Sequence, residues 1–454
     1  MNFLKKNADA LKISFILIYI FTAMSFFVMT QPFGDGPDEI DRYKIVSFIE
    51  RHGTLPLGDD SEVLIGGYGA SYAFQPISTY MISGYLLRLL TPLMLSDSAK
   101  LIIARYVNVL FGLIAAYFTF RISKLLFKDK DIAFLFAAAV TLLPQNIFIY
   151  TYVNTDGIGL MSIAIIIYGI LRGYRTDFDI KSVVALALGI SFCLLSYYNC
   201  YGYVLVAFIA FVVYFIRKKD YKSMFKKGIP IAVTVLCLAG WWFIRNGILY
   251  NGDIFALNAR RECAQRTGEP EWLYIMSQTY HATGHSLYEM LFKSDYITLV
   301  WRSFVAMFGP MTIPTSRYVY WVYAGLFFVS IIGLFIPFKP TFLDSFDKKK
   351  GLLIRFYLVI SAIIPAALAI FYSYEWDYQP QGRYYLPCLI PFFALLSTGM
   401  EKLILFAGNS AKKITKKEDA DFKIKSMSVF ILCLVFLISV AVSVVRILTH
   451  YGVL

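Results

Sequence analysis

The sequence predicts an all-α protein that crosses a membrane many times. Of its 454 residues, 58% are hydrophobic and only 16% are charged, and the mean hydropathy of +0.62 is far above that of soluble proteins. Apolar runs long enough to span a bilayer recur along the whole chain, with short basic connectors between them. No soluble domain is visible, so we expect a single integral membrane domain over residues 1–454.

The basic connectors predict the orientation of the helices. They hold 27 of the 43 Lys and Arg residues, and the positive-inside rule places them on the cytoplasmic side together with the N-terminus. This topology also accounts for the net charge of +13 without nucleic acid as a partner. The connectors are 5–12, 121–130, 172–181, 217–227, 339–350 and 402–425.

The apolar segment 75–93 decides the order of the spans. If it crossed the membrane, the basic connector 121–130 would lie outside, against the positive-inside rule. We therefore expect a juxtamembrane helix on the outer face, within a first external loop at 31–100. A large external loop follows at 249–316. About eleven transmembrane helices result, at 12–30, 101–120, 132–150, 157–171, 183–198, 201–216, 229–248, 317–337, 352–372, 384–404 and 427–448.

Two adjacent carboxylates stand just after the first span. Asp38 and Glu39 follow two glycines and a proline, which keep the chain near the head groups. Burial there raises the pKa of a carboxyl group and makes it a usable base, so we predict that this pair is catalytic. The alternative is a solvated acidic loop, and for the acidic residues within 59–62 that interpretation is sufficient.

Two arginines are predicted at the same interface. Arg245 lies in the last turn of the span 229–248, and Arg383 stands just before the span 384–404. Each could extend its charged end into water, which is ordinary for arginine. Two guanidinium groups beside an acidic loop favour the binding of a phosphate at head-group depth, so we predict that role for both.

Other polar residues on the outer side are candidates for substrate binding. For those in the turn at 152–160, capping of the next helix is an equally good interpretation. His281 and His285 have the spacing of helical metal ligands, but no third ligand accompanies them, so no metal site is predicted and their roles stay undetermined. No cofactor is certain, and a divalent cation remains open. The candidates are Asp35, Arg42, Asn154, Asp156, Asn246, Asp253, Gln381 and Tyr384.

Several ordered motifs resemble known membrane glycosyltransferases. GPDEIDRY after the first span resembles the Asp-Glu signature of protein O-mannosyltransferases and lipid A aminoarabinose transferases, and ARYVN at 104–108 is similar to an Arg-x-x-Asn pattern of those enzymes. The combination of PDE, VNTDG, IRNGILYNGD, WRSFVAMFG and QGRYYLP is similar to a bacterial membrane family of unknown function grouped with the GT-C fold. The resemblance covers about residues 12–395.

The resemblance implies an inverting GT-C glycosyltransferase. Its donor would be a polyprenyl-phosphate-linked sugar, and its acceptor an envelope glycan, lipid or protein on the outer face of the cytoplasmic membrane. Asp38 would match the catalytic aspartate, acting as general base, and Arg383 an arginine near the lipid phosphate. The alternatives are a polysaccharide polymerase or ligase, and a transporter or flippase for lipid-linked sugars. A transporter is disfavoured because charged residues are not seen in the middle of several helices.

Overall fold

The computed structural model describes residues 2–454, with side chains from residue 10 onward, and it is an all-α polytopic membrane protein. Within these residues, nine helical segments are long and apolar enough to cross a membrane. They are formed by α1 (Asn2–Thr30), α4 (Asp97–Leu126), α7 (Asp156–Thr176), α9 (Gly202–Lys218), α10 (Tyr221–Val235) continued by α11 (Trp241–Leu249), α15 (Arg317–Leu334), α16 (Lys348–Glu375), α17 (Leu389–Thr415) and α18 (Ala420–His450).

All eleven segments predicted as spans are helical, but two of them contain no helix long enough to cross a membrane. One is α8 (Ile180–Leu194), an apolar helix of 15 residues. The other, predicted at 132–150, is divided into α5 (Lys130–Thr141) and α6 (Pro144–Phe148). Pro144 accounts for the break, because it has no N–H to continue α5 and instead opens the next helix.

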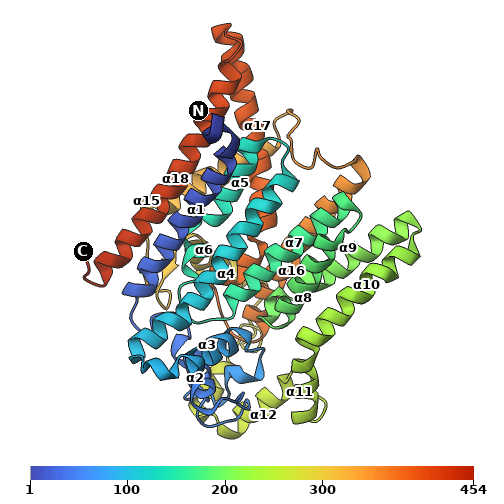
Figure 1. Cartoon of the computed structure of the whole chain (residues 1–454). Coiled ribbons are helices and arrows are strands. Elements are labelled where there is room, and N and C mark those ends of the chain that lie inside the picture. The colour runs from blue at the N-terminus through green and yellow to red at the C-terminus, as the bar shows by residue number, and fades with distance from the viewer. Residues whose placement is uncertain (1) are drawn as a thin grey trace.

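The segment predicted to lie on the surface is not a span. Its main helix, α3 (Ser78–Leu89), has 12 residues, which at about 1.5 Å each cannot cross a hydrocarbon core of roughly 30 Å. The helix packs against α2 (Glu39–His52) and against α4 (Figure 1). The prediction that 75–93 does not cross the membrane is therefore confirmed.

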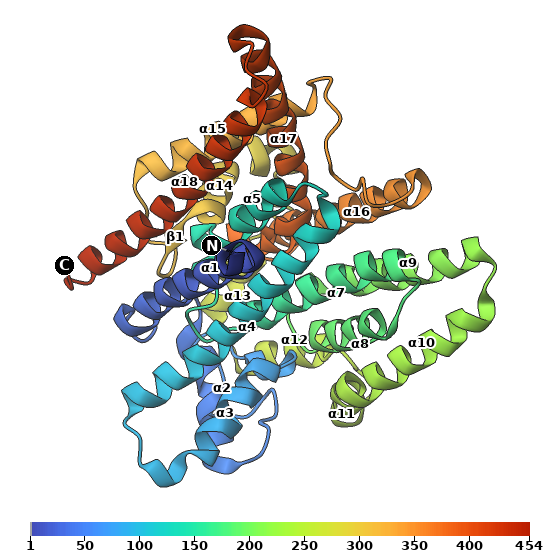
Figure 2. The same ribbon diagram turned by 45° about the horizontal axis from the view of Figure 1, so that its top comes forward.

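Most of the remaining elements are short and lie near the end of the bundle that holds α2 and α3, whereas η4 lies within the span formed by α10 and α11. Figure 1 shows α2, α3, α11 and α12 at the lower end, and the N-terminus with the α17–α18 hairpin at the upper end. The turned view in Figure 2 keeps α2 and α3 side by side. The other helices are α12 (Leu257–Thr267), α13 (Pro270–Ser277) and α14 (Tyr296–Val305), and a ribbon pairs β1 (Met307–Phe308) with β2 (Ile313–Pro314). The 3-10 helices are η1 (Tyr72–Phe74), η2 (Thr91–Leu93), η3 (Tyr198–Cys200) and η6 (Gly382–Cys388), and the π-helical turns are η4 (Leu236–Gly240) and η5 (Glu289–Lys293).

The helix α7 is the centre of the bundle. Of its membrane-crossing stretch, 94% is buried inside the protein, and it packs mainly against α4 and α8. Because α7 begins at Asp156, the carboxylate in its first turn lies where the central helix meets the loops of the α2–α3 end. The fold therefore directs a charged residue from the core toward the loop that follows α1.

Candidate functional site

The loop between α1 and α2 holds Asp38 in an uncommon conformation. Asp38 is the N-cap of α2 and has φ 61° and ψ 13°, a left-handed geometry that aspartate tolerates better than most residues. Gly36 brings the loop against the turn before α7, because a Cβ at this position would lie 2.6 Å from the Cβ of Tyr152. A larger residue would push the two segments apart. The loop and the turn are therefore fitted to each other.

Glu39 is part of a buried ion pair. Its side chain is fully buried, and its two carboxylate oxygens accept bonds from Arg105 Nε at 2.8 Å and Arg105 Nη2 at 2.6 Å. Arg105 also donates to the backbone carbonyls of residues 28, 31 and 32, and Glu39 accepts from the amide of Val153 at 3.0 Å. This pair ties the end of α1, the start of α2 and the turn before α7 to α4.

Two asparagines hold the turn that precedes α7. Asn108 on α4 donates to the carbonyl of Tyr152 at 2.6 Å and to that of Asn154 at 3.2 Å. The Asn154 side chain is buried, accepts from the amide of Gly157 at 2.9 Å and so caps α7. Asn154 thus follows the capping interpretation, and Asp156 is left as the polar side chain of the turn that faces the site.

Arg383 enters the site from η6, just before α17. Gly382 makes this possible, since a Cβ there would lie 2.0 Å from the backbone nitrogen of Phe304, and its own amide donates to Ser303 Oγ at 2.7 Å. The chain is thereby pressed against α14. The Arg383 side chain is nearly buried, with 7% of its surface exposed.

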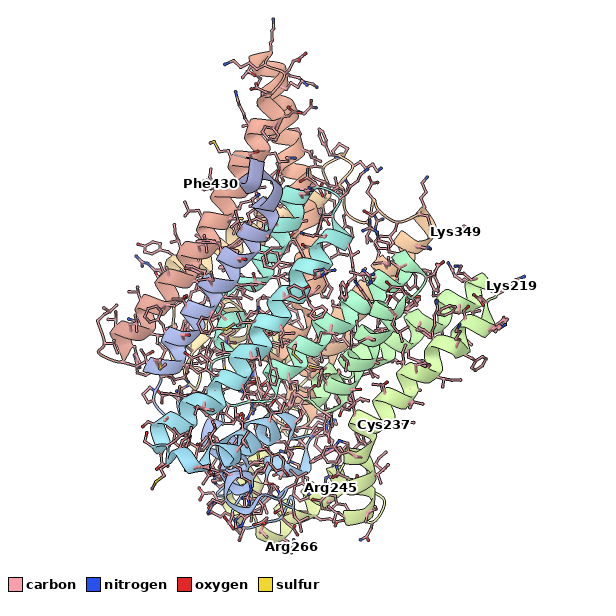
Figure 3. The ribbon with its side chains drawn as sticks, in the orientation of Figure 1. Lys219, Cys237, Arg245, Arg266, Lys349 and Phe430 are labelled. Carbon is pink, nitrogen blue, oxygen red and sulfur yellow. The ribbon has the colours of Figure 1, made fainter. Side chains whose placement is uncertain are left out.

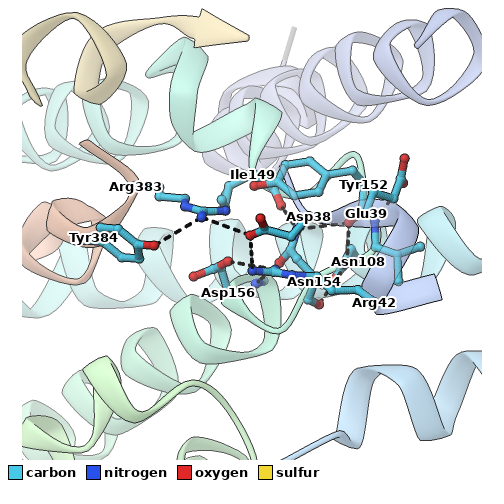
Figure 4. Close-up of polar contacts among 12 residues, drawn as sticks. Asp38, Glu39, Arg42, Asn108, Ile149, Tyr152, Asn154, Asp156, Arg383 and Tyr384 are labelled. Atoms are coloured by element: carbon cyan, nitrogen blue, oxygen red, sulfur yellow. Dashed lines mark hydrogen bonds and ion pairs between the residues drawn. The ribbon is translucent and has the colours of Figure 1, made fainter. Parts of the chain in front are cut away.

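Four charged side chains from three parts of the chain converge (Figure 4). Asp38 Oδ2 lies 3.1 Å from Arg383 Nη2 and 3.0 Å from Arg42 Nη2, and Asp156 Oδ2 lies 3.5 Å from Arg42 Nη1. Arg42 also stacks over the ring of Tyr72, with 5.0 Å between its Cζ and the ring centroid. The two carboxylates and two guanidinium groups balance in charge.

Not every donor in this cluster has an acceptor. Arg383 Nη2 also donates to Tyr384 Oη at 3.2 Å, but Arg383 Nε and Nη1 are buried and have no partner among the described residues. Buried donors in native proteins are almost always satisfied, so these two donors, like Arg42 Nε, are available to an acceptor from water or from a bound ligand. Asp38, by contrast, is 36% exposed and can be reached from outside.

The pKa of Asp38 shifts in the direction opposite to the one expected. Burial acts to raise it, but the charges of Arg42 and Arg383, with hydrogen bonds from Arg383 and Tyr72, outweigh burial and bring the pKa below its usual value. The expectation of a raised pKa considered burial alone and is wrong. Asp38 is held ionised, as a proton acceptor must be, by two cations that also weaken it as a base.

Other predicted site residues do not join this cluster. Arg245 donates to the carbonyl of Pro56 at 2.8 Å and lies over the ring of Trp242, at the lower edge of the molecule (Figure 3). Asn246 donates to the carbonyl of Ile254 at 3.3 Å, and Asp253 Oδ2 accepts from two amides at the start of α12. Asn246 and Asp253 hold the loop after α11 together, and Arg245 joins α11 to the loop after α2. For Asp35, the structure adds no contact with the cluster within the described residues.

A hydrogen-bonded chain extends the cluster along the segment before α17. Tyr384 Oη donates to Gln379 Oε1 at 3.1 Å, and the same oxygen accepts from Gln381 Nε2 at 2.6 Å. Gln379 Nε2 in turn donates to Asp377 Oδ2 at 2.6 Å. Gln379 and Asp377 were not singled out from the sequence, although the polar density of YEWDYQPQGR was a signal that could have found them.

Potential metal ligands do not converge in the part of the chain that the structure describes, where no group of three or more His, Cys, Asp or Glu side chains comes together. His281 Nδ1 lies 2.7 Å from Glu375 Oε2, and His285 Nδ1 lies 3.9 Å from Glu289 Oε2. Five of the six cysteines are buried and all six are free, whereas Cys237 is exposed.

Solved structures share the fold of this chain. With 98% of the chain covered, it matches the apo form of the Archaeoglobus fulgidus oligosaccharyltransferase with a TM-score of 0.57 at 12% identity. A second structure of that enzyme, in complex with an inhibitory peptide and a dolichol-phosphate, gives 0.55 at 12% identity over 99% of the chain. The chain spans only 57% and 56% of the length of these proteins. ArnT from Cupriavidus metallidurans bound to undecaprenyl phosphate gives 0.47 at 13% identity, over 98% of this chain and 76% of that one.

At these identities the likeness is one of fold, and the fold is the GT-C fold of membrane glycosyltransferases. No curated protein sequence matches the chain. A family model described as "Predicted membrane protein (DUF2142)" matches residues 94–392, well over half of the sequence. The chain therefore belongs to the DUF2142 family of membrane proteins.

Proposed function

We propose that this protein is a membrane glycosyltransferase that moves a sugar from a polyprenyl-phosphate donor to a hydroxyl of an envelope glycan, lipid or protein, with inversion. The observation that carries the proposal is the contact between Asp38 and Arg383, together with the two buried Arg383 donors that lack an acceptor. A carboxylate open to solvent and a guanidinium with free donors are the two groups that this reaction needs.

The proposed chemistry divides between these two residues. Asp38 takes the proton of the acceptor hydroxyl while the acceptor oxygen forms its bond to the anomeric carbon. The bond from that carbon to the phosphate oxygen breaks on the opposite face, and its electron pair leaves with polyprenyl phosphate. The negative charge that grows on the phosphate is stabilised by the Arg383 Nε and Nη1 donors.

Donor binding would also make Asp38 a better base. In the free protein Arg383 is one of the two cations that hold the pKa of Asp38 low. A phosphate bound to Arg383 places a negative charge nearby and shares the hydrogen-bonding capacity of the guanidinium, so the pKa of Asp38 should rise. The acceptor would then be deprotonated most readily when the donor is already in place.

Other residues of the cluster are proposed to position substrates. Arg42 holds Asp38 and Asp156 in place, Tyr384 is bonded to Arg383, and Gln381 is joined to Tyr384 through Gln379. Glu39 is not proposed as a base, because it is fully buried and both its oxygens are engaged by Arg105. Arg245 is not proposed as a phosphate ligand, because it is engaged by Pro56 at another part of the surface.

A solved structure supports the donor class, and the distribution of Lys and Arg supports the side of the membrane on which the site lies. The oligosaccharyltransferase that shares this fold was solved with a dolichol-phosphate, which supports a polyprenyl-phosphate donor. The connectors rich in Lys and Arg lie at the end of the bundle opposite to α2 and α3, as Figure 1 lets the reader follow. The positive-inside rule then favours a site on the outer face, with the N-terminus in the cytoplasm.

Mass spectrometry of envelope glycans and lipid-linked sugars, in cells with and without the protein, tests the proposal. Loss of the protein should remove a sugar from an envelope component and cause a polyprenyl-phosphate sugar to accumulate. The wild-type gene should restore the product, Asp38→Asn should not, and Asp41→Asn should, because Asp41 pairs with Lys44 outside the cluster. Unchanged glycans and lipid-linked sugars would contradict a transferase.

A further inference from the structure

A second polar cluster adjoins the one that contains Asp38, and it is formed by Arg260, Asp377 and Gln381. Arg260 lies on α12, with its Cζ 5.3 Å from the centroid of the Tyr68 ring. Its Nε is buried without an acceptor, and its side chain forms no hydrogen bond or ion pair anywhere in residues 10–454. Arg260 is only partly buried, so water can reach the rest of its guanidinium, but the buried Nε needs an acceptor, which a ligand would supply.

Asp377 and Gln381 complete the cluster with acceptors. The charge of Arg260 acts on the Asp377 carboxylate, yet the two groups form no ion pair. Gln379 holds Asp377 Oδ2, which leaves Oδ1 available, and Gln381 Oε1 is buried with no donor from the described residues. The cluster thus presents an unpaired donor and two unpaired acceptors, a combination that matches hydroxyl groups, because each hydroxyl both donates and accepts.

The surroundings favour a sugar ring over another polyhydroxyl ligand. Tyr68 lies beneath Arg260, and Tyr372, Tyr72 and Tyr197 are near enough to help raise the pKa of Arg260 against the effect of burial. Aromatic rings offer apolar faces to the C–H surface of a sugar, while charged side chains bind its hydroxyls.

The cluster is also connected to the proposed phosphate site. The bonds from Arg383 to Tyr384, from Tyr384 to Gln379 and from Gln379 to Asp377 are continuous. Tyr72 borders both clusters, since it lies under Arg42 and near Arg260. In a polyprenyl-phosphate sugar the ring is bonded directly to the phosphate, so the sugar must lie beside Arg383.

We propose that Arg260, Asp377 and Gln381 bind the hydroxyl groups of the donor sugar, and so select which sugar is transferred. This inference rests on the proposed function. Arg383 would bind the part common to all donors, and the second cluster would bind the part that differs among them. A donor sugar whose hydroxyls do not match would leave the buried Arg260 and Gln381 atoms unpaired, which is the strongest means of rejecting an analogue.

The test compares two classes of lipid on the full-length protein in detergent. Affinities are measured by isothermal titration for undecaprenyl phosphate alone and for undecaprenyl-phosphate glucose, galactose, mannose and arabinose. Wild type should bind one sugar-linked lipid more tightly than the bare phosphate. Arg260→Gln and Asp377→Asn should each weaken that lipid roughly tenfold or more and leave the bare phosphate unchanged. Arg261→Gln is the matched control, since Arg261 stacks on Trp376 at the surface.

Other outcomes separate failure of the sugar subsite from failure of the proposed function. If wild type binds undecaprenyl phosphate but no sugar-linked form more tightly, or if the two variants weaken both lipids equally, the sugar subsite is overturned while the phosphate site stands. If wild type binds none of these lipids and Arg383→Ala changes nothing, the proposed function itself fails. Size-exclusion profiles that match wild type show that a variant has folded, and Arg260→Lys, which keeps the charge, provides a milder second variant.

Discussion

Asp38 and Arg383 stand 345 positions apart in the sequence, and Arg383 Nη2 lies 3.1 Å from Asp38 Oδ2 in the folded protein. The contact joins the loop after the first helix to the segment that opens α17. It brings a solvent-accessible carboxylate next to a nearly buried cation with unused donors. A proton acceptor and an anion-binding group are thereby adjacent, which is the basis of the following predictions.

Asp38→Asn should reduce turnover by roughly two or more orders of magnitude while the affinity for the lipid donor is largely kept. The amide preserves the size of the side chain but cannot take a proton. Transfer from a polyprenyl-phosphate sugar, measured alongside donor affinity, checks this. Asp41→Asn is the matched control on the same helix and should remain active. Normal turnover in Asp38→Asn would assign the base to another carboxylate.

Glu39→Gln should act on stability rather than on proton transfer. It leaves the buried guanidinium of Arg105 without its counter-charge, and removing one partner of a buried ion pair typically costs about 3–5 kcal/mol. The unfolding temperature in detergent should fall clearly below that of wild type and of Asp38→Asn. A Glu39→Gln protein with normal thermal stability and no turnover would show that Glu39 takes part in the chemistry after all.

Arg383→Lys should retain partial activity, and Arg383→Ala almost none. Lysine keeps the positive charge but loses the planar arrangement of donors, whereas alanine loses both. Because charge builds on the phosphate as the bond breaks, the defect should appear mainly in the chemical step. Single-turnover transfer in detergent measures it, and Arg317→Ala, at an exposed position of α15, is the control. Near-normal rates in both variants would mean that Arg383 binds no phosphate.

The pH dependence of transfer should follow Asp38. Because its pKa is lowered, the ionised form persists into acid, and the acid limb of kcat/KM should lie below the ordinary range of a carboxylate. Arg42→Gln removes one of the two charges that lower this pKa, so the limb should move to higher pH in that variant. A bound phosphate offsets the positive charge of Arg383, so the pKa of Asp38 should be higher in the donor complex. The acid limb of the kcat profile should therefore lie at a higher pH than that of kcat/KM.

Arg51→Gln, which breaks a surface pair with Glu62, is the control for the pH profile and should leave it unmoved. An acid limb that stays in place in Arg42→Gln would show that a group other than Asp38 is titrating.

The membrane orientation can be tested by single cysteines in a background without the native ones. Cysteines in place of Asp59 and Ser96 should both react with an impermeant thiol reagent applied outside, because both positions are exposed at the α2–α3 end. Cysteines in place of Lys219 and Lys349, among the basic connectors, should be protected until the membrane is permeabilised. The reverse pattern would place the site in the cytoplasm.

The helical architecture was accessible from the sequence because membrane insertion depends on local hydropathy. Each span carries its own apolar run, and the basic connectors are counted without knowing which helices touch. The same information identified α3 as a helix that does not cross, since only that assignment keeps all the connectors on one side. Where Pro144 divides the span at 132–150, the local signal was present but was outweighed by the apolar run.

The composition of the site was only partly accessible. Asp38, Arg245 and Arg383 were singled out because each lies at the outer end of a predicted span, but only Asp38 and Arg383 meet, and Arg245 lies elsewhere. Interfacial position is common to all three residues. Which of them meet depends on how α2, α11 and α17 pack, and hydropathy does not encode that.

The tertiary structure alone decided what each charged group does. Asp38 and Glu39 are neighbours in the sequence, yet one is engaged by Arg383 in an open site and the other by Arg105 in a buried one. The direction of the pKa shift at Asp38 differs from the expectation because two charges outweigh burial: Arg42 lies one turn along α2, and Arg383 is brought from the segment before α17 by folding. The sequence by itself determined which segments enter the membrane, because insertion depends on hydropathy summed over adjacent residues. The interaction between two charges depends on the distance between them, and folding sets that distance for residues far apart in the sequence. Only the packed helices could therefore determine which charges pair.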